Sequence, residues 1–265
     1  MRALRGRKYN SRMTRSVAST LGTTLAVDIG ATAIKFGLVD DSGQLLDDVL
    51  RLPTPYPCSP SRLVDVVAHQ IALSRCSRVG VGFPGEFKDG RVIEPGNLSR
   101  VGGITTEIDP LVHQQWQGFD LQAALHVACR QEVRVVNDAT LAALGCSEGH
   151  GTEIVFTLGT GFGIALVVDG TIRRIRDVGA EVFLEGRTYD QVLGESARSI
   201  DEHRWSTLLH AAVRSFVAEF DAETVHFGGG NARRVDPAWF EDLERRVVIN
   251  SNDITLRGVV RLFEQ

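Results

Sequence analysis

Short apolar runs closed by glycine-containing turns are the main pattern along this chain. The run LAVDI at residues 25–29 is followed by Gly-Ala-Thr and by a second apolar run at residues 33–40, which predicts a β-hairpin. Residues 45–52 are expected to add a third antiparallel strand after a turn at residues 41–43. The folded part of the chain is therefore expected to begin near Thr23 as a β-meander.

The same design occurs a second time, where two apolar runs at residues 153–158 and 164–169 flank a glycine-rich turn. Compact apolar runs predict further strands at residues 78–83, 133–136 and 224–227. Helical spacing of apolar positions predicts helices at residues 60–74, 119–130, 139–148, 203–220, 237–245 and 256–263. Residues 84–118 are rich in glycine and proline and lack periodicity, which predicts a long functional loop.

Composition places the chain among ordinary globular proteins, with 265 residues, of which 43% are hydrophobic and 23% charged. The sequence has no run of eighteen apolar residues, so no transmembrane helix and no membrane partner are expected. Its cysteines form no C-x-x-C pair, which argues against a structural zinc site and fits a reducing, cytoplasmic location.

Charge is distributed unevenly along the chain. Residues 1–22 carry basic residues and no acid, whereas the whole chain has 29 basic and 33 acidic residues. The acidic remainder argues against a nucleic-acid partner. The tail at residues 1–22 is expected to be disordered. An organelle transit peptide, a misassigned start with Met13 as the true first residue, and a polyanion-binding tail stay open as alternatives.

The first turn, Asp28-Ile29-Gly30-Ala31-Thr32, brings an acid and small residues to the end of a buried strand. Small residues let phosphate oxygens approach backbone N–H groups, and an aspartate can hold a hydrated Mg²⁺. Many strands end in similar turns, so this motif alone does not decide between a binding loop and a structural turn.

Two further glycine-rich segments fit the same chemistry. The turn from Thr157 to Gly163 alternates three glycines with threonines and can cradle phosphate, helped by Thr160. Gly228, Gly229 and Gly230 follow a predicted strand and would let a flat ring lie on the backbone. A common hairpin turn and a flexible loop are the alternatives.

Asn137 and Asp138 come directly after a predicted strand and before a predicted helix. A carboxylate there can accept the proton of an attacking hydroxyl, and the amide of Asn137 can bind neighbouring hydroxyls. The alternative is that Asp138 only caps the helix that begins at Ala139.

Along the chain the order is the aspartate-glycine turn, Asn137-Asp138, the glycine-threonine turn and the triple glycine. This order resembles the two phosphate motifs, the catalytic acid and the adenosine motif of the actin/hexokinase superfold, and more narrowly the ROK sugar kinases, with the polyphosphate glucokinases most similar. The resemblance runs from about Thr23 to Phe263 and rests on these segments: LAVDIGATAIKFGLVD, VGVGFPGEFKDGRV, NDATLAALGCSEGHG and TLGTGFGIALVVDG. It implies an α/β, two-lobed actin-like ATPase (ribonuclease H-like) fold with mixed sheets flanked by helices. A small first lobe is expected at residues 23–117 plus 255–265, and a larger second lobe at 118–254, with the active site between them.

The resemblance also implies residue roles. Asp138 would be the general base, and Asn97 and Asn137 would bind sugar hydroxyls. Asp28 would lie near Mg²⁺ through water. Donor phosphates and nucleotide would be held by Asp28, Gly30, Thr32, Lys35, Thr157, Gly159, Thr160, Gly161, Gly228, Gly229 and Gly230. The implied activity is transfer of a phosphoryl group from ATP or polyphosphate to a hydroxyl of a glucose-like hexose, by a homodimer.

The sequence departs from the family at its sugar-binding Glu-x-Gly-His motif. The matching residues are Asp177-Val178-Gly179-Ala180, so a shortened acid and an alanine replace the glutamate and histidine, and Glu181 is a candidate substitute. The family's zinc cysteines are also absent, as in polyphosphate glucokinases. A catalytically impaired or re-purposed relative that binds another ligand is therefore the alternative function. A sugar-responsive regulator ranks last, because residues 1–22 are too short for a helix-turn-helix.

Overall fold

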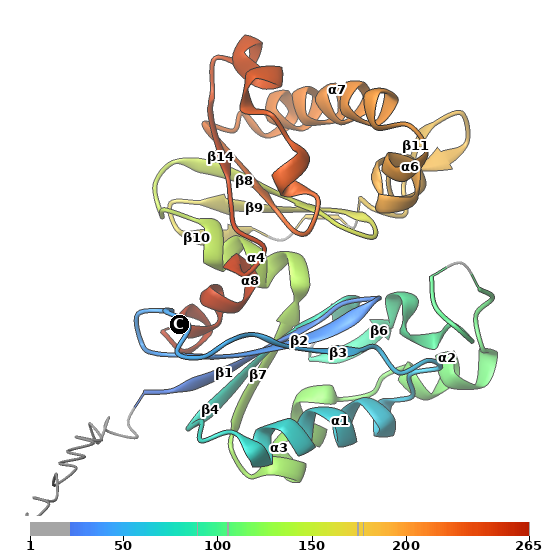
Figure 1. Cartoon of the computed structure of the whole chain (residues 1–265), viewed down its shortest axis with the longest axis vertical. Helices are drawn as coiled ribbons and strands as arrows, with labels where there is room; N and C mark the ends of the chain where they lie inside the picture. Colours follow the sequence, from blue (N-terminus) through green and yellow to red (C-terminus); the bar gives the residue numbers. More distant parts are fainter. Residues whose placement is uncertain (1–21, 89, 105, 174, 177, 265) are drawn as a thin grey trace, which may run out of the picture.

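The structure is a computed structural model that describes residues 22–264 except 89, 105, 174 and 177. Two five-stranded sheets, one in each lobe, lie along the long axis of the molecule (Figure 1). This arrangement confirms the predicted α/β class with two mixed sheets flanked by helices.

The first sheet has the order β3-β2-β1-β4-β7. Its strands are β1 (Thr24–Ile29), β2 (Ala33–Val39), β3 (Leu50–Pro53), β4 (Arg78–Phe83) and β7 (Glu132–Asn137). The predicted hairpin is confirmed, since β1 and β2 pair antiparallel over their whole length. Of the third strand predicted at residues 45–52, only the last part forms, as β3.

Helices α1 (Pro60–Leu73) and α3 (Leu121–Cys129) pack against each other beneath this sheet (Figure 1). The Oγ of Ser59 caps α1 and accepts a hydrogen bond from the N–H of Arg62. The core between helices and sheet is apolar and includes the fully buried Leu63, Val67, Val81 and Leu125. Burial of this apolar face stabilises both layers.

The first sheet extends beyond residue 117, where we expected the first lobe to end. β7 pairs parallel with β4, from Arg78 opposite Glu132 to Phe83 opposite Asn137. Because pairing of β7 depends on a partner strand about 50 residues earlier, no local pattern marks this boundary. Helix α3 and strand β7 thus lie with the first sheet rather than with the second.

The second sheet has the order β10-β9-β8-β13-β14. Its strands are β8 (Thr152–Leu158), β9 (Phe162–Val168), β10 (Thr171–Arg173), β13 (Thr224–Gly228) and β14 (Arg246–Ile249). Helix α7 (Glu202–Phe220) covers one face, with Trp205 and Phe216 buried against Phe156 and Phe227. The predicted hairpin β8–β9 and the predicted long helix are confirmed.

Helix α4 (Asp138–Cys146) connects the two sheets and packs against α8 (Ile254–Arg257) and the 3-10 helix η4 (Gly258–Phe263) (Figure 1). Gly145 and Gly258 touch through their backbones. A Cβ at Gly145 would collide with the carbonyl oxygen of Ile254, and one at Gly258 would collide with that of Leu141. Only glycine allows this close crossing.

The segment 84–118 is more structured than the predicted loop. It contains β5 (Glu86–Lys88), β6 (Arg91–Glu94), the 3-10 helix η1 (Gly96–Ser99) and α2 (Pro110–Trp116). The indole of Trp116 is fully buried and donates a hydrogen bond of 2.8 Å to the carbonyl oxygen of Cys58. This aromatic anchor, rather than sequence periodicity, holds the segment on the first lobe.

Several short elements of the second half were not predicted. They are β10, β14, β11 (Val182–Leu184), β12 (Arg187–Thr188), α5 (Tyr189–Leu193), α6 (Glu195–Ile200) and the 3-10 helix η2 (Ala232–Arg234). The helix predicted at residues 237–245 is a 3-10 helix, η3 (Pro237–Leu243). In the part of the chain that the structure describes, no helix has the length and apolarity to cross a membrane.

Candidate active site

Asp28 and Asp138 lie at the same edge of the first sheet. Asp28, one residue before the end of β1, pairs with Gly82 of β4, which in turn pairs with Val136 of β7, two residues before Asp138. The Cβ that Gly82 lacks would lie 3.4 Å from the Cα of Asp138. Parallel strands thus bring two carboxylates together, separated by about two strand spacings, or roughly 10 Å.

The first turn is rigid and closely tied to its own lobe. Lys35 pairs with Asp28 across the hairpin, and its Nζ lies 2.8 Å from Oδ2 of the aspartate. The N–H of Gly30 donates to the carbonyl oxygen of Ala33 at 3.1 Å, which closes the turn. Two hydroxyls from the segment after β3 also donate to its backbone carbonyls: that of Thr54 to Gly30 and that of Tyr56 to Ala31. Thr32 is exposed at the tip.

Asn137, and not Asp138, is the cap of helix α4. Its Oδ1 accepts hydrogen bonds from the N–H groups of Ala139 at 2.9 Å and Thr140 at 3.4 Å. Its Nδ2 donates to the carbonyl oxygen of Gly85 at 3.0 Å. The alternative that Asp138 serves as the cap is therefore wrong, since Asp138 is the first residue of α4, and its Oδ1 accepts a hydrogen bond of 2.8 Å from the N–H of the next residue.

The second glycine hairpin passes beside the first turn of α4. Thr157 and Gly163 are paired across β8 and β9. A Cβ added to Gly163 would collide with Oγ1 of Thr157 and would lie 3.7 Å from the Cβ of Ala139. Because Ala139 follows Asp138 directly, the hairpin and the candidate base are neighbours.

The triple glycine is fixed to the same hairpin by Asn231, a residue to which we had assigned no role. The N–H of Asn231 donates to the carbonyl oxygen of Leu158 at 2.9 Å, and its Nδ2 donates to that of Gly159 at 3.3 Å. Gly229 has a φ of 86°, and a Cβ there would collide with the carbonyl oxygen of Leu158. Two of the predicted glycine motifs therefore share one end of the second sheet.

Asp190 is a second residue that sequence reasoning missed. Its Oδ1 accepts a hydrogen bond of 2.7 Å from the N–H of Phe162, and its own N–H donates to the carbonyl oxygen of Gly179 at 3.0 Å. A Cβ at Gly161 would collide with this carboxylate, and one at Gly179 would lie 2.7 Å from it. Asp190 thus holds the glycine hairpin next to the altered sugar motif.

The helix that carries Asp190 begins with a recognisable sequence pattern. Thr188 and Gln191 form a capping box at the start of α5, in which each side chain binds the backbone N–H of the other residue. The pattern Thr-x-x-Gln predicts a helix start there, and hence the position of Asp190, although it does not predict what Asp190 contacts.

Glu195 supports the hairpin from the other side. Its N–H donates to the carbonyl oxygen of Gly159 at 2.9 Å. Hydrogen bonds from Arg198 lower the pKa of Glu195 to about 2 against the opposing effect of burial, with further contributions from Ser199 and Asn231. The carboxylate is therefore charged at neutral pH and holds Asn231 in place.

Asn97 and Asp177 are two further residues that were predicted to bind sugar. Oδ1 of Asn97, in η1, accepts a hydrogen bond of 2.8 Å from Nε of Arg100. The neighbouring Gly96 packs so tightly on the carbonyl oxygen of Pro84 that a Cβ would collide with it, which places η1 beside the segment that binds Asn137. Asp177 lies outside the described residues.

Glu181 is engaged in an ion pair. Its Oε1 lies 2.9 Å from Nε of Arg176, and Nη1 of the same arginine lies 2.7 Å from Glu219 on α7. No sequence pattern predicts this pairing.

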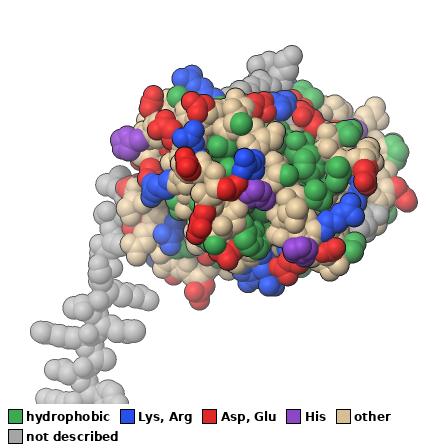
Figure 2. Space-filling model, turned by 90° about the horizontal axis from the view of Figure 1, so that it is seen from above, with side chains coloured by type: hydrophobic (Ala, Val, Ile, Leu, Met, Phe, Trp, Pro, Cys, Tyr) green, Lys and Arg blue, Asp and Glu red, His purple; other side chains and the backbone are tan. Residues whose placement is uncertain are grey.

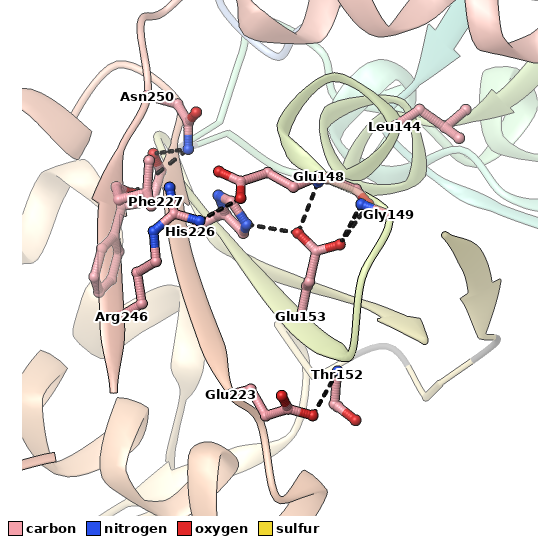
Figure 3. A network of polar contacts seen from close by, with 12 residues as sticks. Leu144, Glu148, Gly149, Thr152, Glu153, Glu223, His226, Phe227, Arg246 and Asn250 are labelled. Atoms are coloured by element: carbon pink, nitrogen blue, oxygen red, sulfur yellow. Dashed lines mark hydrogen bonds and ion pairs between the residues drawn. The ribbon is translucent and has the colours of Figure 1, made fainter. Parts of the chain in front are cut away.

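A buried polar network ties the strands of the second lobe together (Figure 3). Oε2 of Glu153 on β8 lies 2.8 Å from Nε2 of His226 on β13, and both side chains are 1% exposed. The same carboxylate accepts hydrogen bonds from Ser147 Oγ at 2.7 Å and from the N–H groups of Glu148 and Gly149 at 2.9 Å each. These contacts fix the register of the strands that end in the second hairpin and the triple glycine.

The carboxylates of the candidate site fit a magnesium ion that is bound mainly by phosphate oxygens and water. Within the described ranges, no three histidine, cysteine, aspartate or glutamate side chains converge on one point. Mg²⁺ in phosphoryl-transfer sites keeps several waters and needs only one or two carboxylates besides the phosphates. Asp28, at the sheet edge that it shares with Asp138, matches this requirement.

The chain has two mixed sheets, which are joined by α4 and a carboxy-terminal helix, with glycine turns and two aspartates near this connection. These features define the two-lobed actin-like class of α/β proteins. The sequence profile of the ROK family matches residues 24–177, which is more than half of the chain. The chain therefore belongs to the ROK family.

Individual proteins agree with this assignment. The chain is 29% identical over 250 residues to the polyphosphate glucokinase of Mycobacterium leprae, covering 86% of this chain and 71% of the relative. The inorganic polyphosphate/ATP-glucomannokinase of Arthrobacter sp. strain KM superposes with a TM-score of 0.74 at 27% identity, over 92% of this chain and 98% of that one. The ROK family glucokinase of Streptomyces griseus, in complex with glucose and AMPPNP, superposes with a TM-score of 0.68 at 19% identity, over 91% and 99% of the two chains.

Proposed function

We propose that this protein is a sugar kinase that transfers a phosphoryl group from ATP or polyphosphate to a hydroxyl of a glucose-like hexose. The observation that carries the proposal is the position of Asp138, which shares a sheet edge with Asp28 and lies beside the second glycine hairpin. Phosphoryl transfer depends mainly on positioning and charge stabilisation, for which a base and backbone donors on rigid turns are suited. The named activities of the Mycobacterium and Arthrobacter relatives support the choice of substrate and donor.

In this proposal Asp138 takes the proton of the attacking sugar hydroxyl. Asn137 is held between Gly85 and the helix that it caps, so its amide has a fixed direction for a sugar hydroxyl. Asn97 contributes from the neighbouring η1. The donor phosphates lie on the turns of Gly30, Thr32 and Lys35 and of Thr157, Gly159, Thr160 and Gly161. A nucleoside would lie on Gly228, Gly229 and Gly230. A magnesium ion held through water by Asp28 would neutralise phosphate charge.

A kinase assay with Asp138→Asn tests the proposal. Wild-type protein is assayed with hexoses, N-acetylhexosamines and polyols, with ATP and polyphosphate in parallel. The variant should lose the general-base contribution, roughly 10²–10⁴-fold in kcat. Asp120→Asn is the matched control, because Asp120 caps α3 in the first lobe and asparagine caps helices equally well. Equal turnover by Asp138→Asn and wild type would exclude Asp138 as the base.

A re-purposed relative with an altered ligand is the second candidate, and the altered motif favours it. Ala180 offers no side-chain hydrogen bond, and Glu181 would have to leave Arg176 before it could bind a sugar. Calorimetric binding of a sugar without turnover, for every donor tested, would support this candidate over the kinase.

We also propose a homodimer, as the family resemblance implies. Apolar side chains gather in one area of the surface seen from the second-lobe end (Figure 2), and Ile200 and Val182 are 86% and 69% exposed. Sedimentation equilibrium measures the state directly, and a monomer at micromolar concentration would contradict the proposal. A cytoplasmic location remains part of the same proposal.

A further inference from the structure

An open hollow of about 400 Å³ lies beside the helix crossing that connects the two sheets. Three separate segments line it: the turn that follows β2, the carboxy-terminal end of α4, and α8 with η4. Its volume falls within the range of small-molecule sites. The hollow lies away from the glycine turns and carboxylates described above, none of which is among its lining residues.

The charge of the hollow is wholly positive. Its lining includes two arginines, Arg257 and Arg261, and no acidic residue. In the described part of the chain, the guanidinium of Arg257 makes no hydrogen bond or ion pair, and the residue is exposed. By contrast, Arg51 forms an ion pair with Asp253, at 3.4 Å. An unpaired cation on the wall of a cavity is a candidate for ligand binding.

The second arginine is fixed in place. Nη1 of Arg261 donates to the carbonyl oxygens of Leu144 at 2.9 Å and Ser147 at 2.7 Å, at the end of α4. These bonds use one nitrogen of the guanidinium and hold its plane. The remaining donors of the fork therefore have a set direction, which lowers the entropy lost when a ligand binds.

The turn at residues 42–44, which lines the hollow together with the two arginines, is held by hydrogen bonds. Oδ1 of Asp40 accepts hydrogen bonds from Ser42 N–H, Ser42 Oγ and Gln44 N–H at 2.6–2.9 Å, which shapes the turn. These bonds, that of the Ser42 side chain first, lower the pKa of Asp40. Gly43 packs so that a Cβ would lie 2.8 Å from the carbonyl oxygen of Arg257, and the exposed amide of Gln44 adds further donors to the wall.

We propose that this hollow is a second anion site, which binds a phosphate group between Arg257, Arg261 and the turn at residues 42–44. Guanidinium groups match phosphate oxygens in geometry and charge, and the lining holds no carboxylate to repel the ligand. The phosphate is either free inorganic phosphate or the phosphate ester of a sugar. The site does not depend on the proposed kinase activity.

Isothermal titration calorimetry and hydrogen–deuterium exchange, with inorganic phosphate and with glucose 6-phosphate as separate probes, test this inference. Phosphate should slow amide exchange at residues 42–44 and 254–261. Arg257→Gln should abolish that protection and weaken binding at this site roughly 10–100-fold. Gln44→Glu keeps the side-chain size but adds a negative charge, and should weaken binding in the same direction. Tighter binding of glucose 6-phosphate would identify a sugar phosphate as the ligand, and equal affinity would identify free phosphate.

Arg75→Gln is the matched control, because Arg75 is also exposed and without a side-chain partner in the described residues, but follows α1 and does not line the hollow. It should leave binding and protection unchanged. Protection confined to the glycine turn at residues 159–163, or equal binding by wild type and Arg257→Gln, would overturn the second site and leave the kinase proposal intact. Absence of kinase turnover together with protection that depends on Arg257 would contradict the kinase proposal and support the second anion site.

Discussion

The ammonium group of Lys35 lies 2.8 Å from the carboxylate of Asp28, across the first hairpin and within the sheet. The side chains are 17% and 11% exposed, so each charge depends on the other for its stabilisation. This pair sets the charge of the first turn. In the proposed function, a donor phosphate and its metal would approach an aspartate that already has a cationic partner.

Removal of Lys35 should therefore destabilise the fold as well as impair catalysis. Lys35→Met leaves the carboxylate of Asp28 mostly buried without its cation, and we expect a loss of about 1–3 kcal/mol in the free energy of unfolding. Urea denaturation measures this loss. The double variant Lys35→Met/Asp28→Asn should recover part of it, because no unpaired charge remains. A strictly additive double variant would show that the two residues are not coupled.

Asp190 should act on the second hairpin without touching the sugar. Asp190→Ala removes the acceptor for the N–H of Phe162, so the glycine turn loses its fixed position. We expect a raised KM for the phosphoryl donor and a lower kcat in steady-state assays. Asp190→Asn retains an oxygen acceptor and should be milder. If both variants behave as wild type, the hairpin is positioned by other contacts.

The crossing of α4 and α8 should tolerate no side chain at Gly145. Gly145→Ala would force a methyl group against the carbonyl oxygen of Ile254, and overpacking of this kind costs about 1–3 kcal/mol of stability. Thermal unfolding followed by circular dichroism measures the effect. Gly102→Ala is the control, because its added Cβ would make only an ordinary contact of 3.5 Å with Thr106. A melting temperature for Gly145→Ala equal to that of the control would contradict the close crossing.

Glu153 should contribute stability that depends on pH. Burial would raise the pKa of Glu153, but hydrogen bonds from Ser147, Glu148, Gly149 and His226 outweigh it and lower the pKa below its ordinary value of 4.5. A lowered pKa in the folded state gives stability that is fully present above about pH 4.5 and is lost as the pH falls through the lowered value.

Urea denaturation between pH 7 and pH 3 checks this dependence. Glu153→Gln should be less stable than wild type near neutral pH, and the difference should shrink in acid. Glu223→Gln is the control, because Glu223 is exposed and binds the N–H of Thr152 at the start of the same strand. A gap between wild type and Glu153→Gln that stays constant over this range would show that the charge of Glu153 is not what stabilises the network.

Short-range chemistry made much of the fold predictable. Apolar runs of strand length with glycine turns identified both hairpins, and the helical spacing of apolar positions identified α1. The 3.6-residue period identified α7. In each case the residues that decide the element lie within one or two turns of each other. Short elements such as β11, β12 and α6 have too few residues for a period to show.

The sequence alone determined the two glycine hairpins and the longer helices, the order of the glycine and aspartate motifs, and the alanine at position 180. Only the tertiary structure decided that β7 joins the first sheet, that Asn231 and Asp190 hold the second hairpin, and that Arg176 pairs with Glu219 on α7. The physical reason is distance along the chain. Turns and helices depend on neighbouring residues, whereas these contacts join segments up to about 70 residues apart and form only when the sheets fix which strands lie side by side.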